Sequence, residues 1–142
     1  TKEFFGITLY QIKAARAFGG IEEGELGGWV EKEENLSTEG DPWVSGDALV
    51  YGDARVQTRR HIAWFSSVGS ENGTLTTYTI KTGEIEVTRG CFQGTLEEFE
   101  AAVRNTHDGN RYAEEYLVLV QYIRLRFREV SIKAEEVPEK TA

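Results

Sequence analysis

Residues with special chemistry are scarce in this sequence. Among 142 residues there is one cysteine, Cys91, which excludes an internal disulfide framework and fits a reducing compartment. The two histidines, His61 and His107, together with this cysteine cannot supply the four ligands of a structural zinc site within one chain. We therefore expect neither a metal nor a cofactor.

Long apolar runs and known catalytic motifs are also absent. No stretch of 18 apolar residues occurs, so the sequence predicts no membrane-spanning helix. It contains no phosphate-binding Walker loop, dinucleotide-binding glycine motif, serine-hydrolase elbow or zinc-protease motif. Cys91 with His107 and Asp108 is the only possible nucleophile set, and their spacing does not indicate the contact that such a set needs. We expect a protein that is not an enzyme and has no catalytic residues.

Acidic residues outnumber basic ones by 24 to 16, which gives a net charge of −8. This charge argues against direct binding to nucleic acid, which needs a basic patch. Eight of the acidic residues lie between Glu22 and Asp41, where only Lys32 opposes them. Such a surface is typical of a solvated face, or it docks on a basic protein partner. The residues expected to contact that partner are Glu31, Glu33 and Glu34.

A six-residue repeat follows this acidic segment. Gly-Asp recurs three times between residues 40 and 53, and a valine follows each glycine at the fourth position, at Val44, Val50 and Val56. This spacing predicts one coil of a parallel β-helix, with the valines inside and Gly-Asp at the corners. A pair of hairpins with Gly-Asp turns is the alternative. One coil cannot cover its own ends, so other parts of the chain or another chain must cap it.

The second half predicts a three-stranded antiparallel meander followed by two helices. Its strands are expected at 61–67, 75–81 and 84–89, separated by short turns. Thr95-Leu-Glu-Glu98 is a capping box that begins a helix to about Asn105, and a second helix runs from Tyr112 to about Phe127. Apolar and charged side chains alternate over residues 123–133, so the sequence does not distinguish a helix from a strand there.

The expected fold class is therefore α+β, mostly β, with a short β-helix-like N-terminal half. We expect a β-rich module at residues 1–58, a meander and two-helix module at 59–129, and a flexible tail at 130–142.

A polar loop beside an aromatic strand is the expected ligand site. Hydroxyl and amide groups next to aromatic rings suit a nucleobase or ribose, and arginines can hold a phosphate through two hydrogen bonds. A hairpin turn on a core strand and a helix stop are the structural alternatives. Arginines 124, 126 and 128 form a second possible anion site. The residues expected at the first site are Trp64, Ser66, Ser67, Asn72, Arg89, His107, Asn110 and Arg111.

Several stretches resemble a family of bacteriophage and prophage proteins of unassigned function. They include Gly24-Glu-Leu-Gly-Gly-Trp-Val30, Val50-Tyr-Gly-Asp-Ala-Arg-Val56, Trp64-Phe-Ser-Ser-Val-Gly-Ser-Glu-Asn-Gly73 and Gly94-Thr-Leu-Glu-Glu-Phe99. The resemblance covers about residues 6–127. It implies a β-helix-like fold and a phage setting, which places the protein in the cytoplasm of a host bacterial cell. It supplies no reaction and no catalytic residues.

These observations together favour a non-enzymatic phage inhibitor of a bacterial defence system. It would bind a host defence protein through its acidic surface, or sequester a small nucleotide signal. The alternative is a structural module of a phage accessory protein. A homo-oligomer is expected because the second helix is apolar on several sides.

Overall fold

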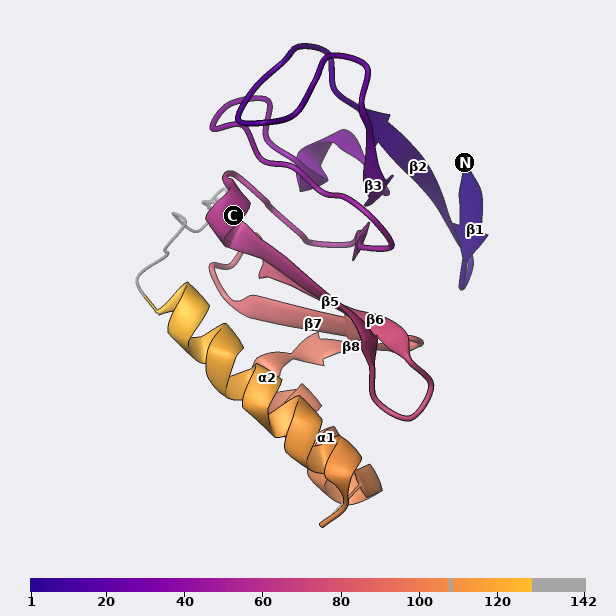
Figure 1. The fold of residues 1–142 in the computed structure, drawn as a ribbon, viewed down its shortest axis with the longest axis vertical. Helices are drawn as coiled ribbons and strands as arrows, with labels where there is room; N and C mark the ends of the chain where they lie inside the picture. Colours follow the sequence, from indigo (N-terminus) through magenta and orange to yellow (C-terminus); the bar gives the residue numbers. More distant parts are fainter. Residues whose placement is uncertain (108, 129–142) are drawn as a thin grey trace, which may run out of the picture.

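A computed structural model describes residues 1–107 and 109–128. The chain forms an α+β structure with two four-stranded sheets and two C-terminal helices. The sheet of the second half lies between the N-terminal half and the helices, so the molecule has three layers (Figure 1).

The first sheet has the strand order β1-β2-β3-β4. The first three strands pair antiparallel, and β4 joins β3 in parallel, with Val50 opposite Val30. A short 3-10 helix, η1 (Glu33–Asn35), follows β3. The strands are β1 (Lys2–Phe4), β2 (Ile7–Lys13), β3 (Leu26–Val30) and β4 (Leu49–Val50).

The predicted β-helix is wrong, because this half is a mixed sheet in which only two hexad residues belong to a strand. The hexads have no further hexads to pair with, so their backbone pairs elsewhere. Residue Val50 pairs with β3, whereas Ala54 forms an antiparallel bridge to Ile80 of the second half. The side-chain prediction is confirmed: Val44, Val50 and Val56 are all fully buried in one apolar cluster.

The second sheet is an antiparallel meander of four strands, in the order β5-β6-β7-β8. The prediction of three strands is wrong because Gly90, at φ +58°, and Cys91 turn the chain back after β7. The following residues then pair with β7 rather than forming a linker. The elements are the 3-10 helix η2 (Arg59–His61) and the strands β5 (Ile62–Val68), β6 (Gly73–Thr79), β7 (Ile85–Arg89) and β8 (Phe92–Thr95).

Both helices begin where the sequence predicts. In α1 (Leu96–His107), the Thr95 hydroxyl accepts from the Glu98 N–H at 3.1 Å, and the Glu98 carboxylate accepts from the Thr95 N–H at 3.1 Å. In α2 (Arg111–Phe127), the side chain of Asn110 accepts from the Ala113 N–H at 3.0 Å. Residues 123–127 are therefore helical, whereas residues 129–133 and the predicted tail at 130–142 lie outside the described residues.

The second sheet has an apolar core on each of its faces. One core joins Leu75 and Val87 of the sheet to the two helices, and the other joins Ile62 and Tyr78 to the hexad valines. The second core crosses the boundary expected after residue 58. No helix in the described part of the chain is long and apolar enough to span a membrane.

Candidate functional site

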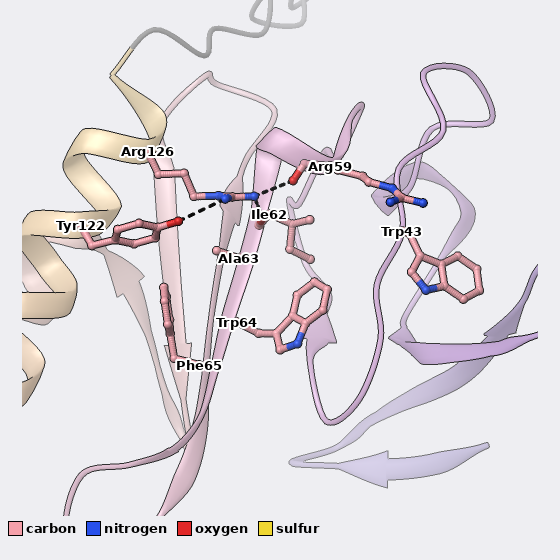
Figure 2. A pocket seen from close by; sticks show the side chains of 8 residues that line it. All are labelled: Trp43, Arg59, Ile62, Ala63, Trp64, Phe65, Tyr122 and Arg126. Carbon is pink, nitrogen blue, oxygen red and sulfur yellow. Dashed lines mark hydrogen bonds between the residues drawn. The ribbon is translucent and has the colours of Figure 1, made fainter. Parts of the chain in front are cut away.

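A hollow of about 310 Å³ lies where the N-terminal half, strand β5 and helix α2 meet. Strand β5 is the edge strand of its sheet, so the hollow opens beside that edge. We call it the aromatic pocket. Figure 2 shows the two arginine side chains along its upper rim and Trp43, Trp64 and Phe65 below them. Its lining residues are Trp43, Arg59, Ile62, Ala63, Trp64, Phe65, Tyr122 and Arg126.

Arg126 holds the walls of the aromatic pocket together. Its Nη2 donates to the Arg59 carbonyl at 2.7 Å and to the Ile62 carbonyl at 2.8 Å, and its Nη1 donates to the Tyr122 hydroxyl at 3.4 Å (Figure 2). These bonds join the end of α2 to η2 and to the start of β5. A guanidinium is suited to this task because its donors are fixed in one plane.

The Arg59 side chain is the exposed cation of the pocket. Its guanidinium lies over the Phe18 ring, 5.6 Å from the centroid. Gly19 leaves room for it, because a Cβ at that position would lie 2.9 Å from Arg59 Nη2. No ion pair within the described ranges involves Arg59, and its exposed side chain lines the pocket.

Four aromatic rings supply the apolar surface of the pocket. Trp43 is 7% exposed, and its buried indole Nε1 has no hydrogen-bond partner. Trp64 is half-buried on β5. The rings of Phe65 and Tyr122 meet edge to face, with centroids 5.7 Å apart. Exposed faces of indole rings stack on planar ligands.

The pocket therefore combines aromatic stacking surface with positive charge in a chain whose net charge is −8. Arg59 and Arg60 are exposed on η2, and Arg126 approaches them from a position 67 residues beyond Arg59. His61 in the same segment adds no positive charge at neutral pH. Its Nδ1 accepts from the backbone N–H groups of Gln57 and Thr58, and burial lowers its pKa.

The structure separates the residues that the sequence placed in one ligand site. Of the residues predicted for that site, only Trp64 lines the aromatic pocket. Ser67 and Arg111 line a second hollow of about 530 Å³ between the β5–β6 turn and the start of α2. Arg89 lines a third, of about 330 Å³, where its Nη2 donates to the Val68 carbonyl at 3.4 Å.

The other residues predicted to bind a ligand lie at a strand irregularity, in a turn and at the ends of the helices. Ser66 is exposed beside the irregularity in the pairing of β5 with β6, and Asn72 adopts a φ of +50° in the turn after it. Asn110 caps α2 through the hydrogen bond described above. His107 is the last residue of α1, and Asp108 lies outside the described residues.

The three predicted partner-binding glutamates also differ from one another. The Glu31 carboxylate accepts from the Gly52 N–H at 2.9 Å, so it ties β3 to the hexad segment. Glu33 and Glu34 are exposed on η1 and line a hollow of about 480 Å³ beside Arg55. Two of the three carboxylates are therefore accessible to a partner.

Within residues 1–107 and 109–128, no group of three or more His, Cys, Asp or Glu side chains is arranged to hold a metal ion. Cys91 is exposed in the turn between β7 and β8.

Sequence reasoning missed most of the aromatic pocket because its residues come from three separate segments, around residues 43, 59–65 and 122–126. The sequence predicts Arg126 in an anion site and Trp64 in a separate ligand loop. Their meeting depends on how the end of α2 packs against η2 and the start of β5, and no local spacing encodes that packing. The alternation of arginine with apolar residues near the end of α2 was the one available signal.

No protein-family model, curated protein or solved structure matches the chain. The resemblance to phage proteins stays a prediction.

Proposed function

We propose that this protein binds a small anionic ligand with a planar ring, such as a nucleotide, in the aromatic pocket. The observation that carries the proposal is the position of Arg59. Its exposed guanidinium has no ion pair among the described residues and lines one hollow together with two tryptophans. A volume of about 310 Å³ is at the lower end of the range for small-molecule sites, so it fits one ring and its charged group.

Each residue has a distinct role in this proposal. Trp64 stacks on the ligand ring, and the Trp43 side chain forms a second apolar wall of the pocket. Arg59 holds the anionic group, because a guanidinium can give a phosphate two parallel hydrogen bonds. Arg126 is a positioning residue, since its Nη2 already donates to two backbone carbonyls. Stacking is sequence-tolerant and worth about 1–3 kcal/mol per base.

In the cell, we propose that binding sequesters a nucleotide signal of a bacterial defence system. This part rests on the resemblance to phage proteins and on the lack of catalytic motifs. The negative net charge would repel a small anion at most of the surface, which supports the aromatic pocket, with its two arginines, as the point of entry. The protein then acts by binding rather than by catalysis.

Isothermal titration calorimetry with 5′-AMP and 3′,5′-cyclic AMP tests the proposal, with uncharged adenosine as the ligand control. Arg59→Ala should weaken binding of the charged ligands by about tenfold or more, because it removes a charge-assisted bidentate contact. Arg60→Ala is the matched control: it removes the neighbouring exposed arginine, which does not line the pocket.

Trp64→Ala should weaken binding of every ligand that has a ring, and Trp64→Phe should restore most of it. Equal losses in Arg59→Ala and Arg60→Ala would show a general charge effect and contradict the assignment of the site. The absence of binding by all the nucleotides would reject the proposed ligand class.

A further inference from the structure

The outer face of α2 carries a stripe of exposed apolar side chains. Val118 is 64% exposed, Tyr122 43% and Leu125 59%. They follow one another at spacings of four and three residues, so they lie on one side of the helix. The opposite side of α2 is buried in the core through Ala113, Tyr116, Val120, Ile123 and Phe127. Figure 1 shows α2 on the outside of the molecule, with α1 behind it.

A line of polar residues runs along one flank of this stripe. Glu114, Gln121 and Arg128 are spaced seven residues apart and are all exposed. Within the described ranges, neither Glu114 nor Arg128 forms an ion pair. The other two arginines at this end of α2 are engaged: Arg124 pairs with Glu100 at 3.2 Å, and Arg126 binds η2.

We propose that α2 packs against the α2 helix of a second copy of this chain, antiparallel, about a two-fold axis near Gln121. In this arrangement Val118 faces Leu125 of the partner subunit. Glu114 then lies beside the partner's Arg128, and the reciprocal pair forms on the other side of the axis. This is the heptad geometry of an antiparallel helix pair, in which residues of the same flank meet.

The charges on the flank select this occupant and this orientation. Glu114 and Arg128 have opposite signs and lie seven residues either side of Gln121, so an antiparallel copy of the same helix is complementary to it. A parallel copy would bring opposite flanks of the two helices together, so Glu114 would not meet the partner's Arg128 and the pairing of opposite charges would be lost.

This inference is independent of the proposed nucleotide binding, although Tyr122 belongs to both surfaces. The helix pairing concerns the oligomeric state of the chain without any ligand. A failure of either proposal leaves the other intact, because calorimetry with nucleotides and the measurement of mass have separate readouts.

Sedimentation equilibrium on the full chain tests the pairing. The wild-type chain should be a dimer at micromolar to millimolar concentration. Glu114→Arg alone and Arg128→Glu alone each place like charges at two symmetric contacts, so each should weaken the dimer by at least about tenfold. An equimolar mixture of these two variants should form a heterodimer with wild-type affinity, because both contacts regain opposite charges.

Glu97→Arg, an exposed charge reversal on α1, is the matched control and should leave the dimer unchanged. Thermal melting should show that all the single variants are folded. Val118→Ser with Leu125→Ser should give a folded monomer. A wild-type chain that stays monomeric would overturn the proposal, and so would a dimer that all these variants leave unchanged. Failure of the mixture to recover the dimer would reject the antiparallel arrangement.

Discussion

The two faces of the second sheet are covered in different ways. On the helix side, buried residues of α1 and α2 close over Leu75 and Val87, and every member of this core comes from residues 65–127. On the other side, Ile62 and Tyr78 meet the hexad valines, and the members range from Ile12 to Ile80. The first core is built from regular helices, whereas the second is built largely from loops and short strands.

Loops lack the internal backbone hydrogen bonds of a helix, so their polar groups need partners from other segments. The N-terminal half supplies such partners. Asn35 is fully buried, and its amide donates to the Gly52 and Ala54 carbonyls at 3.0 and 3.1 Å. The Tyr78 hydroxyl donates to the Tyr51 carbonyl at 3.3 Å. The helix side satisfies its backbone within the helices themselves. The comparison shows that one sheet can serve a regular layer and an irregular layer at once.

The largest expected effect tests whether the two cores form one cooperative unit. Val50 and Val120 are matched in residue type and are 0% and 1% exposed, one in each core. Val50→Asp and Val120→Asp each bury an unpaired charge, so each should lower the free energy of unfolding by about 3–5 kcal/mol. Denaturant unfolding, followed by circular dichroism and tryptophan fluorescence, should give one transition for each variant. Two separate transitions would show that the cores unfold independently.

The junction between the two cores should respond to Arg126. Arg126→Ala removes the hydrogen bonds to the Arg59 and Ile62 carbonyls, so it should cost about 2 kcal/mol of stability. Arg126→Lys should recover less than half of this loss, because an ammonium lacks the planar fork. Full recovery by lysine would show that charge alone holds α2 to η2.

The helix caps should give smaller effects that are confined to the regular layer. Thr95→Ala removes one half of the capping box and should lower the free energy of unfolding by about 1 kcal/mol. Asn110→Ala removes the cap of α2 and should cost a similar amount, about 1 kcal/mol. Chemical denaturation measures both. Losses near zero would mean that tertiary packing alone fixes where the helices begin.

Strand β7 of the second sheet carries a half-buried acid, Glu86, whose neutralisation should be favourable. Burial raises the pKa of the Glu86 carboxyl, so the folded state disfavours its charged form at neutral pH. Glu86→Gln should therefore raise the melting temperature at pH 7. The gain should shrink as the pH falls toward the range where Glu86 itself becomes protonated. A variant that is less stable than wild type at pH 7 would contradict this sign.

Local patterns in the sequence predicted the regular layer closely and the irregular layer only in part. The capping box at Thr95 and the end of α2 near Phe127 both follow from local residue patterns. The buried valines also follow from their six-residue period. The sequence did not predict which residues pair with the backbone of the hexads. Three hexads have no further coil to pair with, so distant residues such as Ile80 become their partners.

The aromatic pocket could not be predicted for the same reason. Trp43 and Arg126 lie 83 positions apart (126 minus 43), and only the packing of α2 against η2 and the start of β5 brings them to one hollow. The predicted ligand loop has the polar and aromatic composition of a binding site. In the structure, however, the register of β5 shifts near Ser67 and Asn110 caps α2, so these residues do not form one site. Composition can indicate the chemistry of a site without indicating its location.

The indole N–H signals of the three tryptophans in a ¹H–¹⁵N NMR spectrum test the central claim most directly. Trp43 and Trp64 line the aromatic pocket, whereas Trp29 lies in β3 with the Lys2 ammonium over its ring, 4.5 Å from the centroid. Titration with 5′-AMP or 3′,5′-cyclic AMP should shift the Trp43 and Trp64 signals together and leave Trp29 unchanged. A shift of Trp29 alone, or of none of the three, would contradict the assignment of the aromatic pocket as a nucleotide-binding site.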